Sequence, residues 1–452
     1  MMARHGVLIR VPNEHAMGTF PSEIPMIGEV HVIAQPDRVE PSVSDYRFIK
    51  QLIKSGLVLS ETAIDLYILA VGCYIADQRI QRKKYGEDSW SRRIDLFVPV
   101  SNPALWEQQS DRITNLLNFL SGDYWSVHFR GRDALPPFRF RGQPEASPNT
   151  NCVSLFSGGL DSFIGAINLL EAGMQPVFIG QYSSPDVISA QKKCAEALRR
   201  NYSDQIKIFH TFTRVKKTML YGDSENTMRS RSFLFLAIGT LIASALVTPA
   251  TLYVPENGFI SLNLPLSLHR LGSLSTKTTH PYLMKSFQIL LNHLELPVTI
   301  CNPFQFKTKG QMVAECANPD FLKANTADTM SCSHPTQARY LPDHPSKCHC
   351  GTCVPCLIRR ASIFHAWGED DTFYARHGSN SLMEFARLER NDRNANIIDL
   401  IATIENYQRR GTITDQHLLV SGTLPDMEHL DLYRAVYSNG LEEIAALLEA
   451  GV

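Results

Sequence analysis

The fold is indicated most clearly by the stretch Cys152-Val-Ser-Leu-Phe-Ser157-Gly-Gly-Leu-Asp-Ser162. Its first five residues form a short apolar run, typical of a buried strand. The two glycines then allow the backbone to turn sharply, and apolar residues at helical spacing follow from Asp161. Backbone N–H groups in such a turn, together with the positive N-terminal end of a helix, form a binding site for phosphate.

The residues around this stretch, from about 149 to 366, alternate between strand-like and helical patterns. We expect strands at Cys152–Phe156, Pro176–Gly180, Ile206–Phe212, Thr251–Pro255 and Val298–Asn302. We expect helices at Asp161–Ala172, Asp186–Asn201, Thr227–Val247 and Pro281–Leu294. This order predicts an α/β fold with a parallel sheet covered on both faces, and a ligand beyond the carboxyl ends of its strands.

Two further regions flank this core. Residues 1–148 predict an α+β region with an amphipathic helix at Thr62–Arg82 and strands at Ile94–Pro99 and Trp125–Arg130, and a proline-containing linker follows from about 133 to 150. We find no catalytic constellation there and favour a partner-binding role. Residues 367–452 predict a helical region, with helices at Ile397–Tyr407 and Leu432–Leu448.

Charge and hydropathy exclude some classes of function. With 44 basic and 45 acidic residues the formal net charge is −1. This balance argues against an enzyme that binds nucleic acid mainly through contacts with the phosphate backbone. The first residues lack the apolar segment of a signal peptide. The longest apolar run, Phe233–Val247, is too short to span a membrane. We therefore expect a cytoplasmic protein that requires neither membrane nor nucleic acid.

The turn itself carries groups suited to binding ATP. The hydroxyls of Ser157 and Ser162 can donate to phosphate oxygens, and Asp161 can hold a bridging Mg²⁺. A Walker A loop is excluded because the Gly-Lys-Ser/Thr ending is missing. The alternative is a serine–glycine turn before an ordinary helix, with Asp161 as a common residue of a first helical turn.

The chain has ten cysteines, and five of them fall between Cys332 and Cys356. Three have two-residue separations in Cys350-Gly-Thr-Cys353-Val-Pro-Cys356, a spacing that allows one loop to wrap a tetrahedral ion. Cys332 is the candidate fourth ligand, and Cys348 and His349 compete with it. A structural Zn²⁺ is expected, with an iron–sulfur cluster or unliganded buried cysteines as the alternatives.

Taken together, these motifs resemble a known family. The hexad at Ser157–Ser162 is similar to the SGGxDS signature of the PP-loop ATP pyrophosphatases, whose fold is of the adenine nucleotide alpha-hydrolase (HUP-like) type. In order along the chain, Asn302-Pro-Phe-(x)4-Lys309, Met330-Ser-Cys332 and Cys350-Gly-x-Cys353-x-x-Cys356-x-x-Arg359 follow. This order resembles QueC, the 7-cyano-7-deazaguanine synthase, over about residues 150 to 366.

The resemblance implies roles for particular residues. The ATP loop would comprise Ser157, Gly158, Gly159, Leu160, Asp161 and Ser162, and the zinc ligands would be Cys332, Cys350, Cys353 and Cys356. Asp161, Arg231 and Lys309 would act in catalysis. For Lys309, a solvated surface lysine is the alternative. Glu256 and Asn257 stand where the family has a different acidic stretch and can read a purine-like edge.

The flanked core also resembles the QueC-like proteins of anti-phage systems, QatC of Qat and the QueC-like member of type IV CBASS. This implies adenylation of a 7-deazaguanine carboxylate and transfer to a nitrogen nucleophile. The nucleophile would be the N-terminal amine of a partner protein encoded nearby. The alternatives are a small-molecule synthase that uses ammonia and a non-catalytic nucleotide sensor. The expected cofactors are ATP, Mg²⁺ and Zn²⁺.

Overall fold

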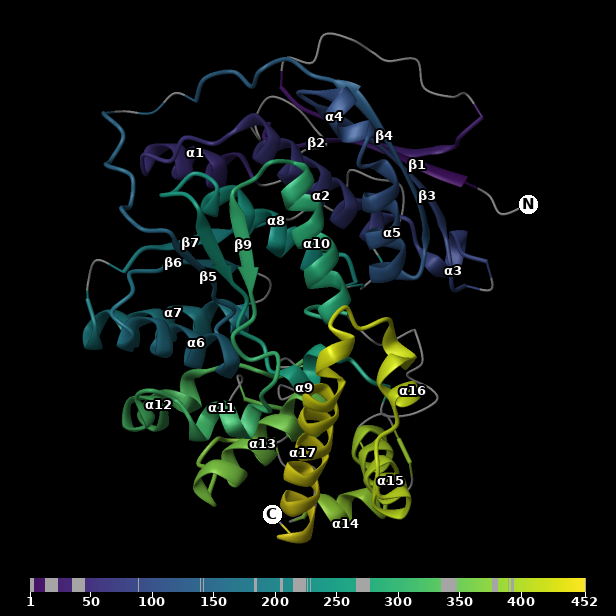
Figure 1. Cartoon of the computed structure of the whole chain (residues 1–452), viewed down its shortest axis with the longest axis vertical. Coiled ribbons are helices and arrows are strands. Elements are labelled where there is room, and N and C mark those ends of the chain that lie inside the picture. The colour runs from purple at the N-terminus through teal and green to yellow at the C-terminus, as the bar shows by residue number, and fades with distance from the viewer. Residues whose placement is uncertain are drawn as a thin grey trace.

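The structure is a computed structural model of the 452-residue chain. It describes all residues except 1–3, 13–22, 35–44, 88, 139, 141, 183–184, 204–205, 214–224, 226, 228, 266–276, 335–347, 376–380, 389, 392–393 and 452. Figure 1 shows three tiers from top to bottom: an N-terminal sheet with its helices, a central sheet, and a group of helices that includes the C-terminus.

The central sheet has the parallel strands that the sequence predicts. They are β5 (Cys152–Leu155), β6 (Val177–Gln181), β7 (Ile208–Thr211), β8 (Ala250–Tyr253) and β9 (Val298–Cys301). Their order is β7-β6-β5-β8-β9, and every neighbouring pair is parallel. The chain therefore builds outward from β5 in one direction and then returns to its other side. The carboxyl end of β5 lies at this switch point, where open α/β sheets bind ligands.

Helices cover both faces of this sheet, as predicted. On one face α6 (Leu160–Glu171) and α7 (Pro185–Asn201) share a core with Phe156 and Phe178. On the other face α8 (Arg231–Ala243) and α10 (Pro281–His293) share a core with Val153 and Val177.

Helix α8 begins at Arg231, four residues after the predicted Thr227. The cause is Asp77, whose Oδ2 accepts hydrogen bonds from the Thr227 hydroxyl (3.2 Å) and the Ser230 N–H (3.2 Å). These bonds hold the preceding residues in a turn outside the helix.

The N-terminal tier differs from the prediction in class. Its strands are β1 (Arg4–Arg10), β2 (Met26–His31), β3 (Arg93–Val100) and β4 (Tyr124–Gly131), in the order β2-β1-β3-β4. All three pairings are parallel, so this region is α/β and not α+β. Its helices are α1 (Tyr46–Lys54), α2 (Glu61–Arg79), α3 (Arg82–Tyr85), α4 (Pro103–Glu107) and α5 (Ser110–Ser121). Parallel strands need long crossover connections, and these helices lie in the connections from β2 to β3 and from β3 to β4.

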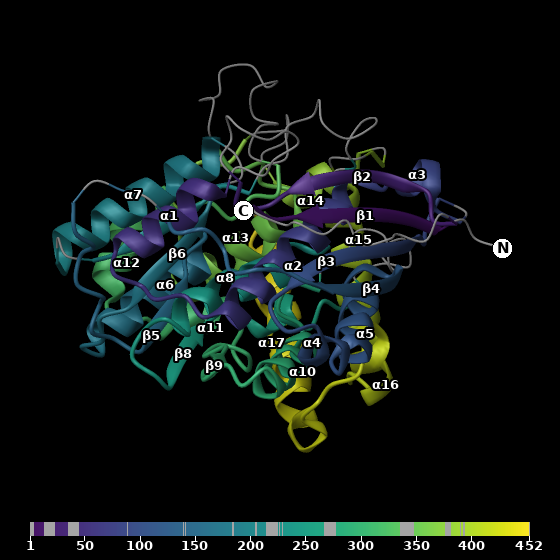
Figure 2. The same ribbon diagram turned by 90° about the horizontal axis from the view of Figure 1, so that it is seen from above.

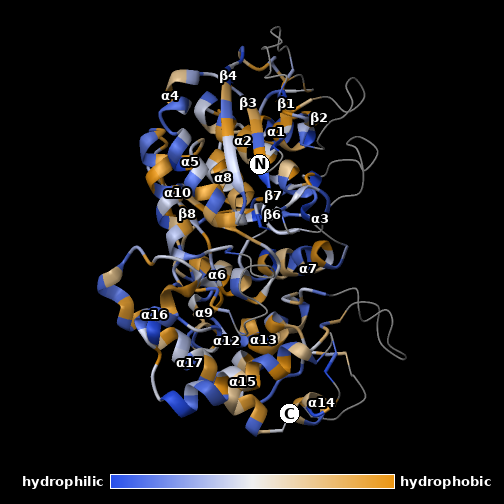
Figure 3. Cartoon of the chain, turned by 90° about the vertical axis from the view of Figure 1, so that its right-hand side faces the viewer, coloured by the Kyte–Doolittle hydropathy of each residue, from blue (hydrophilic) through white to orange (hydrophobic). Residues whose placement is uncertain are grey.

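The helix expected at Thr62–Arg82 is α2, but it is buried on nearly all sides and is not amphipathic. It packs against α8 on one side and against β1 and β3 on the other. A Cβ at Gly72 would lie 2.9 Å from Ile9, so this glycine allows the close approach of α2 to β1. Figure 3 colours much of α2 and α8 as hydrophobic, and Figure 2 shows both between the two sheets. One apolar core therefore joins the N-terminal and central tiers.

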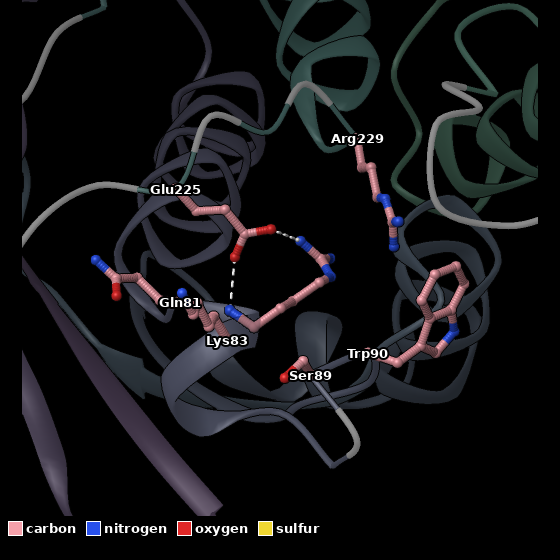
Figure 4. A pocket seen from close by; sticks show the side chains of 7 residues that line it. Gln81, Lys83, Ser89, Trp90, Glu225 and Arg229 are labelled. Carbon is pink, nitrogen blue, oxygen red and sulfur yellow. Dashed lines mark hydrogen bonds and ion pairs between the residues drawn. The ribbon is translucent and has the colours of Figure 1, made fainter. Parts of the chain in front are cut away.

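Charged side chains join the same two tiers at their edge. Arg82 donates to Asp123 (2.6 Å) and to Glu225 (2.7 Å), which precedes α8 in sequence. A pocket of about 480 Å³ opens beside them (Figure 4). There the Arg229 guanidinium lies 5.4 Å from the centre of the Trp90 ring. Arg82 and Glu225 form an ion pair with each other. We therefore interpret this side of the pocket as a structural contact, or joint, between the N-terminal and central tiers.

The predicted linker contains no helix or strand among its described residues. It is nevertheless tied to its surroundings, because Glu145 N–H donates to the Lys54 carbonyl (2.8 Å) and the Glu145 carboxylate pairs with Lys207 (2.9 Å).

The lowest tier is helical. It combines four helices that precede residue 368 with the helices that the sequence predicts for residues 367–452. It contains α9 (Gly258–Ser261), α11 (Lys309–Ala314), α12 (Pro319–Asn325), α13 (Val354–Trp367), α14 (Leu382–Ala386), α15 (Ala395–Arg410), α16 (Asp415–Leu418) and α17 (Leu430–Glu449). Apolar residues of α9, α13, α15 and α17 form one cluster. Within the described part of the chain, no helix combines the length and the apolar composition that crossing a bilayer requires.

Candidate functional site

The turn between β5 and α6 has a conformation that requires glycine. Gly158 has φ +78°, in the left-handed region, and a Cβ there would lie 2.8 Å from Gln191 of α7. The amide of Gln191 donates to the Ser157 carbonyl (3.1 Å) and so holds the turn from the other side. The turn is therefore fixed by its own backbone and by α7, and the side chain of Ser157 remains exposed.

The hydroxyls and N–H groups of the turn point toward one another. Ser157 Oγ and Ser162 Oγ are 3.1 Å apart, and Ser162 Oγ also donates to the Gly159 carbonyl (3.0 Å). The Gly159 N–H donates to Ser157 Oγ (3.2 Å). Several donors thus gather at the first turn of α6, where the partial positive charge of a helix favours an anion.

Asp161, in the first turn of α6, forms a buried ion pair with Lys309. The Lys309 Nζ lies 2.8 Å from Asp161 Oδ1, and the two side chains are 4% and 8% exposed. From the sequence alone, Lys309 could also be a solvated surface lysine. Its burial in the structure excludes that alternative. The neighbouring Lys307 is the surface residue, with its side chain 41% exposed and paired with Glu315.

Asn257 and Glu256 meet Asp161 from the segment after β8. The Asn257 side-chain amide donates to Asp161 Oδ2 (2.7 Å) and to Glu256 Oε1 (3.2 Å), and its backbone N–H also donates to Oδ2 (3.1 Å). Its side-chain oxygen accepts from the Ile260 N–H (2.9 Å) and caps α9. Asn257 is thus fully used within the protein, which makes it a residue that positions Asp161.

The two carboxyl groups of this cluster have opposite pKa shifts. Burial raises the pKa of Asp161, but the Lys309 ammonium and hydrogen bonds from Glu256, Lys309 and Asn257 outweigh it and bring the pKa below its usual value. Burial and the nearby Asp161 carboxylate raise the pKa of Glu256 well above its usual value. Asp161 therefore carries the negative charge of the pair, and Glu256 holds a proton.

Arg231 lies one strand away, at the start of α8. Its Nε donates to Gln181 Oε1 (3.1 Å) at the carboxyl end of β6, and its guanidinium lies 4.8 Å from the centre of the Phe235 ring. The Gln181 carbonyl in turn accepts from Gln191 (3.2 Å), which also holds the turn. Arg231 therefore lies at the carboxyl edge of the same sheet, next to β6.

The four predicted cysteines come together as one buried group. The sulfur atoms of Cys332, Cys350, Cys353 and Cys356 all lie within 4.8 Å of one another. A zinc ion bound at Zn–S distances of about 2.3 Å holds its sulfurs about 3.8 Å apart. The Cys350–Cys356 distance is 3.8 Å and the Cys332–Cys353 distance is 4.0 Å. The group can therefore hold a single metal ion such as zinc.

Hydrogen bonds to sulfur support this interpretation. Cys350 N–H donates to the sulfur of Cys332 (3.3 Å), and Cys353 N–H donates to the sulfur of Cys350 (3.3 Å). A cubane cluster would bind each thiolate to a different iron and spread the sulfurs farther apart, so the spacing favours one ion.

Neither competitor belongs to this group. Cys348 packs separately against Ala375. Burial lowers the pKa of His349 to about 2, and its neutral imidazole Nε2 accepts a hydrogen bond from the Ser331 N–H (3.3 Å). His349 thus supports the segment that carries Cys332.

The cysteine group and the turn are joined directly. Met330 N–H donates to the Gly158 carbonyl (2.8 Å), and Ser331 Oγ accepts from the Leu160 N–H (3.4 Å). Both residues immediately precede Cys332. Ser331 and Gln191 are site residues that the sequence did not predict. The position of Ser331 beside a predicted ligand was a signal for it, and a single glutamine within a helix gave none for Gln191.

No family model fits the chain, and no curated protein matches it in sequence.

Proposed function

We propose that the chain is an ATP-dependent enzyme of the PP-loop class that adenylates the carboxylate of a 7-deazaguanine and releases pyrophosphate. The observation that carries the proposal is the buried pair of Lys309 and Asp161 at the start of α6. This pair adjoins a glycine turn at the switch point of a parallel sheet. A buried ammonium beside a phosphate-binding turn is suited to stabilise charge that develops on a leaving phosphate.

The turn would bind the phosphates of ATP. Their oxygens would accept from the Gly159 and Leu160 N–H groups, which here donate to the hydroxyls of Ser157 and Ser331. Ser157 and Ser162 can then act as donors, because a hydroxyl serves in either role. The 12-residue helix α6 adds its positive end.

Asp161 is the residue that would hold Mg²⁺, through oxygens that now face Lys309 and Asn257. When bound, this ion neutralises phosphate charge. Lys309 lies beside Asp161 and would move its ammonium toward the departing pyrophosphate. Glu256, which holds a proton, would donate a hydrogen bond without adding negative charge.

The chemistry comprises two displacements. A carboxylate oxygen of the substrate forms a bond to the α-phosphorus of ATP, and the bond to the bridging β-phosphate oxygen breaks, so that pyrophosphate leaves with the electron pair. A neutral amine then attacks the acyl carbon of the adenylate, AMP leaves, and the nitrogen loses a proton. Preorganised donors at the turn would supply most of the stabilisation of the first transition state.

The cysteine group would have a structural role in this proposal. Zinc held by four protein sulfurs has no open position for a substrate. Its contribution would be to fix Met330 and Ser331 against Gly158 and Leu160.

The acceptor proposed for the second step is the N-terminal amine of a partner protein, on the resemblance to the QueC-like proteins of anti-phage systems. A terminal amine has a pKa near ~8 and is partly neutral at cellular pH, unlike lysine at ~10.4. Intact-mass spectrometry of proteins encoded beside this gene, co-expressed with wild type or Asp161→Asn, tests it. A deazaguanine adduct that requires Asp161 supports the ligase, and free nitrile with unmodified partners indicates an ammonia-using synthase.

Adenylation is tested with ATP, Mg²⁺ and 7-carboxy-7-deazaguanine. The wild type should form AMP and pyrophosphate, and Lys309→Ala should reduce the rate by about 10²-fold or more. Lys307→Ala is the matched control, since that lysine lies two residues away and is exposed. ADP as the main product, or equal rates for the two variants, contradicts the proposal. Binding of ATP without turnover would indicate a nucleotide sensor.

A further inference from the structure

The C-terminal helix α17 places a buried carboxylate behind Lys309. Glu443 is 5% exposed, although its neighbour Glu442 is exposed. The Glu443 carboxylate accepts hydrogen bonds from the Thr308 hydroxyl and from the Gly310 N–H (3.2 Å). These two residues flank Lys309, so one side chain of α17 binds the Thr308 hydroxyl before this lysine and the Gly310 backbone after it.

The contacts of Glu443 with Thr308 and Gly310 depend on the local geometry of both residues. The Thr308 hydroxyl donates to Glu443, and its oxygen accepts from the Gln311 N–H (3.1 Å), so its orientation is fixed. A Cβ at residue 310 would lie 2.5 Å from the Glu443 carboxylate, so the approach requires Gly310. Buried carboxylates are rarely retained without a partner, and here two hydrogen bonds provide one.

Helix α17 also contacts the second segment that reaches Asp161. The rings of Tyr437 and Phe259 stack with centres 5.2 Å apart and an interplanar angle of 21°. Phe259 lies in α9, which Asn257 caps. Figure 1 shows α17 beside α9, α11 and α13. The helix therefore supports both segments that place a donor on Asp161, one through Lys309 and the other through Asn257.

We propose that Glu443 is a positioning residue that fixes Thr308–Gly310 so that the Lys309 ammonium meets Asp161. The C-terminal region then helps to set the geometry of the active centre. The catalytic meaning of this inference rests on the proposed function, but the positioning itself does not.

Chemical labelling of Lys309 tests the positioning without any turnover. Lysines of the intact protein are acetylated briefly, and the modification of Lys309 is measured relative to Lys307 by mass spectrometry. Glu443→Ala should raise this ratio by about tenfold or more, because both hydrogen bonds that hold Thr308 and Gly310 are lost. Glu443→Gln, which keeps an acceptor oxygen, should raise it less. Glu442→Ala should leave it unchanged.

The labelling has a decisive contrary result. An unchanged ratio in Glu443→Ala, with the bound metal retained, overturns the proposal. If that variant does not fold, Glu443→Gln and Thr308→Val provide the same comparison, and an unchanged ratio in both overturns it equally.

A double-mutant cycle then tests the link to catalysis. In the pyrophosphate assay Glu443→Ala should lower kcat by about 10-fold to 10²-fold, and it should have little further effect in a Lys309→Ala background. Losses that simply multiply would show a general structural role and contradict the inference. If Glu443→Ala raises the labelling of Lys309 but the wild-type protein forms no pyrophosphate, the proposed function is rejected and the positioning role of Glu443 stands.

Discussion

The two parallel sheets of this molecule have the same construction but carry their charges differently. Beyond the carboxyl end of β3, Asp65 accepts from the Ser101 N–H (2.8 Å), the Trp106 indole (3.2 Å) and Arg132 (2.7 Å). At the carboxyl end of β5, the charged pair of Asp161 and Lys309 adjoins an exposed serine in a glycine turn. A parallel sheet alone therefore does not make a site.

The difference extends to the other end of β3. The fully buried Arg92 pairs with Asp77 (2.6 Å) and Asp123 (2.5 Å), and further donates to the Asp77 carbonyl (2.7 Å). These charges satisfy one another within the N-terminal tier and at its joint with α8. In the central tier a comparable network lies next to backbone N–H groups that can exchange a hydroxyl for a ligand oxygen. We infer that the first network stabilises the fold and the second serves chemistry.

Removing the metal ligands, which lie beside the turn of the central sheet, should have the largest effect. The purified protein should hold about one zinc ion per chain. Cys353→Ser should lose it and unfold at much lower denaturant concentration, because metal binding supplies folding free energy. Elemental analysis and urea unfolding measure both effects.

Cys348→Ser is the control for this experiment, since Cys348 lies outside the group. It should retain the metal. A wild-type protein without metal, or with iron and a brown colour, would refute the assignment.

Breaking the buried network of the N-terminal tier should reduce stability and not catalysis. Asp77→Asn removes the partner of Arg92 and should lower the free energy of unfolding by about 3–5 kcal/mol. The pyrophosphate rate per folded molecule should stay near that of wild type at a temperature where the variant is folded. If Asp77→Asn instead lowers the pyrophosphate rate and leaves stability unchanged, the proposed difference between the two networks is wrong.

Asp161→Asn should reduce the pyrophosphate rate more than it reduces stability, the reverse of Asp77→Asn. We expect the pyrophosphate rate to fall by about 10²–10³-fold. The free energy of unfolding should fall by about 1–3 kcal/mol, because Lys309 loses its closest counter-charge. Rate measurements and urea unfolding on the same preparation give both values, and a variant with normal turnover would contradict the role of Asp161.

The pH dependence of stability should separate two buried aspartates. Burial raises the pKa of Asp45 to about 7, whereas Lys309 brings that of Asp161 below its usual value. Asp45 therefore binds a proton in the folded state that the unfolded chain releases near pH ~4. Its contribution to stability is present below that pH and is lost at about 1.4 kcal/mol per pH unit up to roughly pH 7. The contribution of Asp161 has the opposite sign, since it is present above pH ~4 and is lost in acid.

Asp45→Asn should remove the first slope from a plot of unfolding free energy against pH. The exposed Asp320→Asn is the control and should leave the plot unchanged. An identical slope in wild type and Asp45→Asn would show that the Asp45 carboxyl does not hold its proton in the folded protein.

The sequence predicted local features of the central tier well. All five of its strands and its four expected helices are present, because each depends on hydrophobic periodicity and on glycines or prolines close in sequence. The cysteine group was predicted for the same reason, since three of its members share one short loop. What failed was the class of the N-terminal tier, because strand direction depends on crossover connections and not on a local pattern.

Contacts between distant segments escaped prediction for a physical reason. Lys309 lies 148 positions from Asp161, and its local sequence fits a surface lysine as well as a buried one. In sequence, Glu443 is an ordinary acidic residue of a predicted helix. Its burial follows only from the packing of α17 against α11, which the local sequence does not show. The burial of α2 on nearly all sides likewise follows from α8, which is contributed by another region.

The most direct test of the account follows an oxygen atom. 7-Carboxy-7-deazaguanine labelled with ¹⁸O in its carboxylate is incubated with the protein, ATP, Mg²⁺ and an amine, and the phosphate-containing products are analysed by mass spectrometry. Adenylation joins a carboxylate oxygen to the α-phosphorus, so cleavage of the adenylate at its acyl carbon leaves one ¹⁸O in AMP. The account predicts labelled AMP and unlabelled pyrophosphate. Label in inorganic phosphate, or AMP without label, would contradict it.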